Sequence, residues 1–376
     1  MKHQKITILL FFLMLVMVPL LIFFLPKQDF SQQENRYLAD FPEISLQAIA
    51  DQEFMEGFDQ YVADHFPLRT SWIGMKTELE YLSGQKEVNG VYILNDRLIE
   101  KIDEIDKQNV HQSIEAMNSF AERFRGSTSL MLIPTASEIY KDRLPSDTSR
   151  IAQKEEIDQI YGQVKKILTI DAYSSLMSNA QKSIFYRTDH HWTSLGAYLG
   201  YSAASKQLGY TPVAVERFNV EHASHEFRGS LYSKVIYDGV EPDDIDIYTY
   251  ANSSYVRKVD IFDGKQWTEA DDIYHRDYLD KKDQYSVFLG QNQPIMTIYT
   301  NISNGNNLLI FKDSYSHSMV PFLALHYSKI TLVDLRYLTD SFENWVDLDD
   351  YHQALFCYNF KNFAVDHDVQ KVNFPK

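Results

Sequence analysis

The stretch that decides the fold is residues 306–319, which read NNLLIFKDSYSHSM. Its first half is a short apolar run with polar residues on both sides, which is typical of a buried parallel strand. A polar turn follows, and the chain then shows a helical pattern at 318–327 and strand-like runs at 329–335 and 353–359. Because parallel strands need a crossover connection, this alternation predicts β-α-β steps in an α/β fold.

The same alternation extends toward the N-terminus. Strand-like runs occur near residue 92 and at 129–134, and helical patterns occur near 108–124 and at about 152–167. We therefore predict that residues 88–376 form one large α/β sandwich. Within it, a segment at about 211–285 is rich in Asp, Tyr and His and has no assignable period, so we interpret it as an irregular insertion.

The N-terminus carries a long uncharged segment. Lys2 and Lys5 precede a run from Ile6 to Leu25 that has no charged residue. At about 1.5 Å per residue this run is roughly 30 Å long, which is enough to span a bilayer. No small-residue cleavage site follows it, and positive residues before a span hold the N-terminus in the cytoplasm. We expect residues 1–26 to be a cytoplasmic tip and an uncleaved transmembrane anchor, with the rest of the chain outside.

Residues 27–87 are predicted to form a stalk with a helical lead-in. Apolar residues recur at three- and four-residue intervals from Phe54 to Phe66, and Pro67 then ends this amphipathic helix. A second helical pattern runs from Arg69 to Tyr81. Both helices precede the α/β part of the chain.

Charge and cysteine content exclude several classes of function. The 36 basic and 52 acidic residues give a formal net charge of −16, which repels the phosphates of nucleic acids. We therefore expect no nucleic acid partner. The single cysteine, Cys357, excludes an intramolecular disulfide and any multi-cysteine metal site.

Ser314 lies where a predicted strand stops and a predicted helix begins. A serine in such a turn can point its hydroxyl out of the sheet edge, and the free N–H groups of the helix start can stabilise an oxyanion. This is the geometry of a nucleophile. The alternative is an ordinary N-cap, because Ser, Thr, Asp and Asn open helices in all kinds of protein.

A second stretch, RTDHHWTSLGAY at residues 187–198, offers the base that such a serine needs. A serine hydroxyl requires a histidine to remove its proton, and the imidazole requires a carboxylate to orient it. On an extended backbone Asp189 and His191 share one side, and His190 faces away. The alternative is a solvated surface loop, which is less compatible with four uncommon residues in a row.

Two metal-binding interpretations have less support than the serine and histidine one. His222 and His225 have a spacing that can bind a metal on a helix, but no third ligand accompanies them, so we favour a solvated loop. An Asp-His-His string also occurs in metal-dependent phosphoesterases, whose other aspartate motifs precede it near an N-terminal strand. The anchor occupies that place here, so we reject that interpretation. We expect neither a metal nor a cofactor.

These motifs and their flanks resemble the DHHW protein family, which is related to the alginate O-acetyltransferase (AlgX/AlgJ) type of SGNH-hydrolase-like domains. The resemblance covers nearly the whole chain, with stretches in the family's order at 30–45, 61–72, 132–145, 227–234, 280–294 and 333–337. It implies a flavodoxin-like three-layer α/β/α sandwich. It also implies a catalytic triad in which Ser314 is the nucleophile, His191 the general base and Asp189 its orienting carboxylate.

The resemblance further implies an oxyanion hole at the sheet edge. The N–H of Ser314 is the first expected donor, and Gly229 in FRGSLYS and Asn292 in LGQNQP are further candidates. The chain departs from the expected pattern in two places. Gln291 stands where a glycine is expected, which weakens the argument for Asn292, and Lys312 replaces a glycine before the nucleophile turn.

The function implied is that of a membrane-anchored, extracytoplasmic O-acetyltransferase at a bacterial cell surface. Its substrate would be a cell-surface or secreted polysaccharide, and a membrane-bound O-acyltransferase would supply the acetyl donor. A carbohydrate esterase that uses the same triad is an alternative, because water can replace the sugar hydroxyl. A non-catalytic glycan-binding scaffold is a third possibility, and it predicts that Ser314 is unreactive.

Overall fold

The computed structural model describes residues 2–24, 26–145, 151–250 and 255–375. The chain divides into two compact units. The first comprises Met1–Asn89 and Tyr232–Gly239, and the second comprises Gly90–Leu231 and Val240–Lys376. The predicted division at residues 26 and 87 stays a prediction.

The first unit begins with the long helix α1 (Lys2–Phe24). Its segment Gln4–Ile22 is long and apolar enough to cross a membrane. The helices predicted on each side of Pro67 are confirmed as α3 (Glu53–Asp64) and α4 (Arg69–Leu82).

Two arginines join the segment before α3 to the helices of this unit. The Arg36 guanidinium donates two hydrogen bonds to the Asp64 carboxylate, at 2.8 and 2.6 Å, and Arg69 donates to Glu34 at 2.9 Å. Hydrogen bonding to Arg36 lowers the pKa of Asp64 to about 2. These ion pairs fix the chain that connects α1 to α3.

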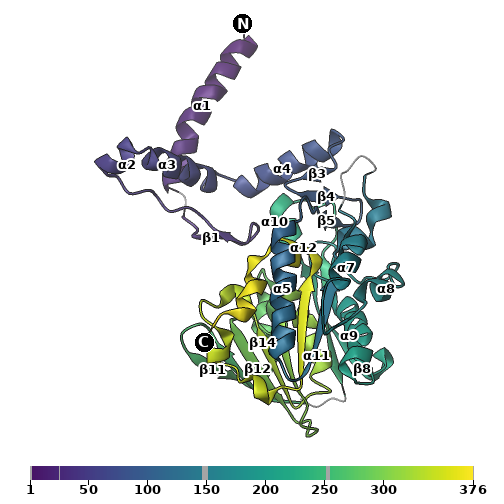
Figure 1. Ribbon diagram of the computed structural model, residues 1–376. Helices are drawn as coiled ribbons and strands as arrows, with labels where there is room; N and C mark the ends of the chain where they lie inside the picture. Colours follow the sequence, from purple (N-terminus) through teal and green to yellow (C-terminus); the bar gives the residue numbers. More distant parts are fainter. Residues whose placement is uncertain (1, 25, 146–150, 251–254, 376) are drawn as a thin grey trace. The chain divides into compact units, whose positions relative to one another are not determined.

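The second unit is built on an eight-stranded mixed sheet (Figure 1). Its strands, in spatial order, are β11 (Trp267–Ala270), β10 (Val256–Phe262), β12 (Ile295–Thr300), β14 (Lys329–Val333), β13 (Asn307–Lys312), β15 (Gln353–Asn359), β6 (Ser127–Ile133) and β7 (Ile167–Thr169). The strands from β14 to β7 are parallel, and β11, β10 and β12 extend the sheet in antiparallel fashion. The carboxyl ends of the parallel strands therefore meet at one edge.

Hydrophobic cores lie on both faces of this sheet. Alternate residues of one strand enter different cores: Leu308 and Ile310 of β13 belong to one cluster, and Leu309 and Phe311 belong to the other. Helix α9 (Ser194–Leu208) packs on the first cluster, and α5 (Lys107–Arg123) packs on the second. The apolar runs of these strands are thus continuous because both faces are covered.

The predicted α/β class is confirmed, but the strand order is not that of flavodoxin. Numbered along the chain, the parallel strands read 2-1-5-3-4, whereas the flavodoxin-like order is 2-1-3-4-5. The segment at 211–285 contributes β10 and β11 to the sheet instead of standing apart from it. It also forms a separate two-stranded ribbon of β8 (Phe218–Phe227) and β9 (Asp243–Tyr250).

The remaining elements are short. Helices are α2 (Leu46–Ala50), α6 (Ala136–Ile139), α7 (Gln153–Tyr161), α8 (Ala172–Met177), α10 (Ser230–Val235), α11 (Val320–Leu323) and α12 (Phe360–Val365). Strands are β1 (Phe30–Ser31), β2 (Arg36–Tyr37), β3 (Glu87–Val88), β4 (Val91–Ile93) and β5 (Leu98–Glu100). The 3₁₀ helices are η1 (Lys141–Arg143), η2 (Val215–Arg217), η3 (Arg276–Asp280), η4 (Gln284–Val287), η5 (Ser314–Ser318), η6 (Leu335–Tyr337), η7 (Phe342–Asn344), η8 (Leu348–Asp350) and η9 (His367–Asn373).

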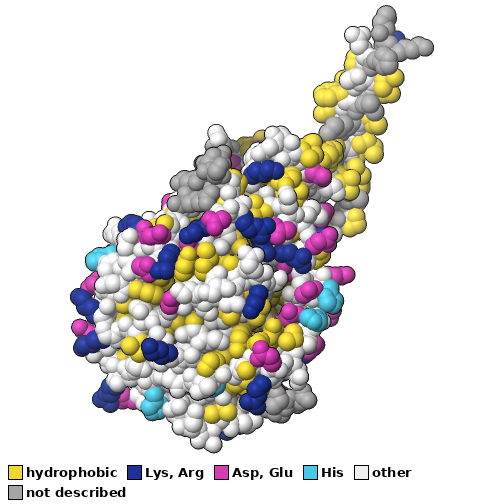
Figure 2. All heavy atoms as spheres, turned by 90° about the vertical axis from the view of Figure 1, so that its right-hand side faces the viewer, with side chains coloured by type: hydrophobic (Ala, Val, Ile, Leu, Met, Phe, Trp, Pro, Cys, Tyr) yellow, Lys and Arg dark blue, Asp and Glu magenta, His cyan; other side chains and the backbone are white. Residues whose placement is uncertain are grey.

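The surface carries charges of both signs. On the face that Figure 2 shows, the described Lys and Arg side chains are interspersed with Asp and Glu side chains. Positive charge is therefore not gathered into one area of this face.

Candidate active site

Ser314 lies at the carboxyl edge of the parallel strands, directly after β13. It is the first residue of η5 and is half-buried. Asp313 caps this short helix, because its Oδ1 accepts from the Tyr315 N–H at 3.0 Å and its Oδ2 accepts from the Asn359 N–H at 2.8 Å. Burial raises the pKa of Asp313. The predicted strand-turn-helix around Ser314 is thus present, with its turn tied to the end of β15.

The Asp-His-His-Trp stretch is a bent loop and not an extended strand. Phe185 and Trp192 form an isolated antiparallel bridge, and the Tyr186 N–H donates to the His191 carbonyl at 3.2 Å. The six residues between Phe185 and Trp192 fold back on themselves. The expectation that His190 faces away from His191 is therefore wrong: their ring centroids are 3.8 Å apart.

This loop and the nucleophile turn bring three predicted residues together. Asp189 Oδ1 lies 2.6 Å from His191 Nδ1, and His191 Nε2 lies 2.7 Å from Ser314 Oγ. The Asp189 side chain is 5% exposed and the His191 side chain 8% exposed. The three groups form a continuous hydrogen-bonded chain from a buried carboxylate to the hydroxyl of a half-buried serine.

The loop also holds the Asp189 carboxylate in its ionised form. Burial opposes ionisation, but His190, His191 and the Ser230 N–H, which donates to Oδ2 at 2.7 Å, hold the pKa of Asp189 well below its ordinary range. Its Oδ1 also accepts from the His191 N–H at 2.9 Å. An ionised, multiply bonded carboxylate can fix the tautomer of the imidazole beside it.

Tyr285 is a site residue that the sequence did not reveal. Its ring is stacked on the His191 imidazole with centroids 3.8 Å apart and planes 7° apart. Its hydroxyl donates to the Ser314 carbonyl at 3.0 Å. Tyr285 therefore fixes the plane of the histidine and the backbone of the serine. It has no local signature, because nothing in a single tyrosine 29 residues from Ser314 indicates this contact.

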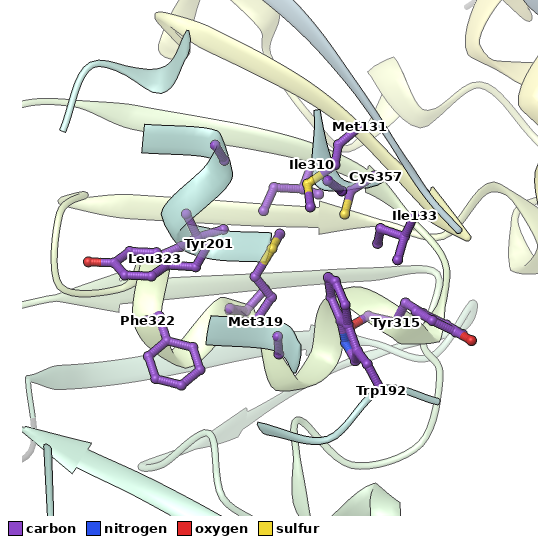
Figure 3. Packing of buried hydrophobic residues seen from close by; sticks show 14 of the residues in the cluster. Met131, Ile133, Trp192, Tyr201, Ile310, Tyr315, Met319, Phe322, Leu323 and Cys357 are labelled. Atoms are coloured by element: carbon purple, nitrogen blue, oxygen red, sulfur yellow. The ribbon is translucent and has the colours of Figure 1, made fainter. Parts of the chain in front are cut away.

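Trp192 anchors the loop in the core. Its side chain is fully buried, and its indole N–H donates to the Tyr315 carbonyl at 2.8 Å. Figure 3 shows the Trp192 ring beside Tyr315. Helix α9 accommodates the indole because Gly200 lacks a side chain, and a Cβ there would lie 2.6 Å from the ring. The tryptophan thereby links the histidine loop to the nucleophile turn.

His190 lies beside the chain of three groups without forming part of it. Its Nδ1 is 2.6 Å from Ser230 Oγ and 3.7 Å from Asp189 Oδ1. The Tyr315 hydroxyl donates to the His190 carbonyl. These contacts place His190 as a support for Asp189 and for the loop.

Gly229 touches the site in a different way from the one predicted. Its N–H donates to Thr188 Oγ1 at 3.1 Å, and a Cβ at this position would lie 2.3 Å from Asp189 Cβ and 2.4 Å from Asp189 Oδ2. A glycine is therefore required for the close approach of Asp189. The role of the Gly229 N–H as a donor in the oxyanion hole stays a prediction.

Asn292 is held by Lys312, the residue that replaces the expected glycine. The buried Lys312 ammonium donates to Asn292 Oδ1 at 2.8 Å and to Asp334 Oδ2 at 3.0 Å, and it lies 2.7 Å from His317 Nε2. Burial lowers the pKa of Lys312, while Asp334 opposes this shift. Oδ1 of Asn292 accepts this hydrogen bond from Lys312. The Nδ2 group of the same side chain is the one that can donate to another group.

The backbone at Ser314 supplies one further donor. As the first residue of a helix, Ser314 has an N–H without an acceptor inside that helix. Across the described parts of the chain, no other group accepts a hydrogen bond from it. This N–H remains available to a ligand next to the Ser314 hydroxyl.

Two groups of histidines contain atoms that could ligate a metal. Asp189, His190 and His191 offer ligand atoms within 4.8 Å of one another, but both ring nitrogens of His191 already lie at hydrogen-bond distance from side chains. His222 and His225 lie on the exposed strand β8 and pair with Asp246 and Asp244, each at 2.7 Å. Neither arrangement presents the ready set of free ligands typical of a metal centre.

The protein-family model named DHHW protein matches residues 83–333, which is more than half of the chain. The chain belongs to the DHHW protein family. A search of curated proteins found no match.

Two of the solved structures that match this DHHW protein share its fold. A DHHW family protein from Eubacterium siraeum is 23% identical, with a TM-score of 0.67, and the match covers 77% of this chain and 97% of that one. Bacillus cereus PatB1 with a sulfonyl adduct is 18% identical, with a TM-score of 0.64 and coverage of 76% and 98%. The O-acetyltransferase domain of Pseudomonas putida AlgJ is more distant, at 14% identity, a TM-score of 0.45 and coverage of 74% and 93%.

Proposed function

We propose that this DHHW protein is a serine-dependent O-acetyltransferase that acts on a polysaccharide outside the cytoplasmic membrane. The observation that carries the proposal is the hydrogen-bonded chain from Asp189 through His191 to Ser314. A nucleophile, a base and an orienting carboxylate in this geometry are the groups that acyl transfer requires.

The reaction is a double displacement. His191 Nε2 takes the proton of Ser314 Oγ as this oxygen attacks the acetyl carbonyl of the donor, and the leaving oxygen of the donor then takes that proton. Acetyl-Ser314 results. In the second half, His191 takes the proton of a sugar hydroxyl as its oxygen attacks the acetyl carbon, and Ser314 Oγ leaves and regains a proton.

The protein also has to stabilise the negative oxygen that forms in each half-reaction. The Ser314 N–H is the donor that the geometry supports best, because it is unengaged and adjacent to the nucleophile. Asn292 is a second candidate, with Lys312 holding its carbonyl oxygen so that the NH₂ group is left to donate. Preorganised donors of this kind stabilise an oxyanion without reorganising during the reaction.

The substrate, the donor and the location complete the proposal. The acceptor is a cell-surface or secreted polysaccharide, and a membrane-bound O-acyltransferase supplies the acetyl donor. Segment Gln4–Ile22 of α1 is the proposed anchor, with the second unit on the outer side of the membrane. Its length and composition support this role.

Mass spectrometry of the full chain after incubation with an activated acetyl ester tests the proposal. We expect an added acetyl group on Ser314, and we expect a sulfonyl fluoride to modify the same residue. PatB1 has been solved with a sulfonyl adduct. An unmodified Ser314 under both treatments would favour a non-catalytic scaffold. Release of acetate from acetyl-Ser314 without transfer to any glycan would favour an esterase.

The rate of acyl-enzyme formation is expected to rise with pH when it is measured from about pH 5 to about pH 8, because protonation of the base stops the transfer. The base must be neutral to take the Ser314 proton. Titration of Asp189 adds no further change of the rate in this range, because its pKa is depressed and its carboxylate is protonated only at still lower pH. Stopped-flow release of 4-nitrophenol from 4-nitrophenyl acetate measures the profile. A flat profile across this range would exclude a histidine base in this step.

His190→Ala is expected to lower the rate of acyl-enzyme formation by less than about tenfold. Ser314 Oγ is hydrogen-bonded to His191, whereas His190 Nδ1 is hydrogen-bonded to Ser230. His190 therefore acts on the site through Asp189 and the loop. The same 4-nitrophenyl acetate assay, with circular dichroism to verify folding, measures the effect. A loss equal to that of His191→Ala in a folded variant would reverse the assignment of the base.

A further inference from the structure

The loop that follows β6 lies near the nucleophile at the same edge of the sheet. Strand β15 separates β6 from β13, so the carboxyl ends of β6 and β13 are roughly 10 Å apart at about 4.8 Å per strand. The loop contains α6 and η1. In open α/β sheets, ligands bind outside the carboxyl ends of the strands, and this loop is therefore placed to contact a ligand of Ser314.

Two adjoining hollows lie along this edge. The smaller, of about 20 Å³, has His190, Tyr315, Asn359 and Ser137 among its lining residues. The larger, of about 140 Å³, begins at the same Ser137. Its volume is roughly ten times what one water molecule needs, which suits the ring and hydroxyl groups of one sugar residue.

The larger cavity is lined by both apolar and polar side chains. Tyr92, Ile102 and Leu144 are among its apolar residues, and Glu138 and Lys141 are among its polar ones. Cavities that bind small molecules combine apolar side chains with a few placed polar groups in this way. The apolar side chains suit the C–H groups of a sugar ring, and the polar ones suit its hydroxyl groups.

The charges of the cavity select against an anionic ligand. Glu138 is 3% exposed, and its two oxygens accept from Lys141 Nζ at 2.8 Å and from the Gln153 N–H at 3.0 Å. Glu155 adds a second carboxylate, so two negative groups accompany one positive group. A carboxylate has about four acceptor sites, and Glu138 therefore keeps capacity for the hydroxyl of a ligand.

We propose that the larger cavity binds an uncharged sugar residue of the acceptor glycan, next to the residue that receives the acetyl group. This inference rests on the proposed function for the identity of the acceptor. It deepens that function by excluding polyuronates, because their carboxylates would meet Glu138 and Glu155.

Binding to the full-length Ser314→Ala variant in detergent micelles tests the inference without requiring transfer. The probes are tetrasaccharides of β-1,4-linked glucose, of N-acetylglucosamine and of galacturonic acid, measured by titration calorimetry. We expect at least one neutral probe to bind, and to bind at least tenfold more tightly than the galacturonate. Absence of binding by both neutral probes, or a preference for the galacturonate, would overturn the inference.

A matched pair of variants locates the bound sugar. Ala152 lines the cavity, is exposed and makes no side-chain cap bond, so Ala152→Phe fills the space without disturbing the core. Gln159→Phe places the same side chain at an exposed position of α7 outside the cavity. We expect Ala152→Phe to weaken binding of the neutral probe about tenfold and Gln159→Phe to leave it unchanged. Equal affinity in both variants would place the sugar elsewhere.

The two proposals can fail separately. With Ser314 restored, Ala152→Phe should raise the KM for the glycan and leave both kcat and the acetylation of Ser314 unchanged. If Ser314 takes no acetyl group while the neutral probe binds at Ala152, the transferase proposal fails and the sugar site remains. If Ser314 is acetylated while Ala152→Phe alters neither affinity nor KM, the sugar site fails and the transferase proposal remains.

Discussion

Ser314→Ala and His191→Ala are each expected to lower the rate of acetyl transfer by roughly 10⁴- to 10⁶-fold. Either change breaks the 2.7 Å contact between the base and the nucleophile. The double variant is expected to be no slower than the slower single variant, because residues that act as a unit are not additive. Transfer of acetyl from 4-nitrophenyl acetate to a glycan acceptor measures all three rates.

Folding has to be separated from catalysis in this comparison. Ser314 is half-buried and Ala is smaller than Ser, so Ser314→Ala should retain the near-ultraviolet circular dichroism of the parent protein. His190→Ala serves as the matched histidine control. A double variant whose loss equals the product of the two single losses would show that Ser314 and His191 act independently, contrary to the triad.

Gly229→Ala is expected to lower kcat/KM about 100-fold with the fold retained. The new Cβ would lie 2.3 Å from Asp189 Cβ, which is closer than packed atoms approach, so the carboxylate has to move. A displacement of about 1 Å in a positioned catalytic group costs about 10²-fold in rate. The 4-nitrophenyl acetate assay measures the loss.

Gly162→Ala is the control for this substitution. Gly162 follows α7 with φ −71°, and its nearest new contact would be the Asp158 carbonyl at an ordinary 3.5 Å. We expect its activity to equal that of the parent. If Gly229→Ala is folded and fully active, Asp189 either tolerates displacement or does not orient the base.

Local sequence predicted the elements of this protein better than it predicted their contacts. The apolar run at 307–312 and the turn at Ser314 were predicted correctly, because strand periodicity and turn chemistry are local. β7 was missed because it has only three residues, Ile167–Thr169, too few for a period to show. The strand order was also missed, because pairing partners are set by packing of the whole sheet.

The candidate site divides in the same way. Ser314, His191 and Asp189 could be named from the strand-turn-helix pattern, the Asp-His-His-Trp motif and the family resemblance, and the structure places them within hydrogen-bond distance. The orientation of His190 was predicted wrongly because alternation applies only to extended backbone. Tyr285 was not predicted because stacking on His191 depends on two segments that meet only in the folded chain.

The contacts of Tyr315 set the order in which the site can assemble. Its carbonyl receives the Trp192 indole N–H and its hydroxyl reaches the His190 carbonyl, so it is joined twice to a loop 123 and 125 residues earlier in the chain. A nascent chain that has not yet passed residue 315 carries the histidines without the partners that shape them. A chain that stops before residue 315 is therefore expected to lack an assembled site, although it already contains the whole Asp-His-His-Trp stretch.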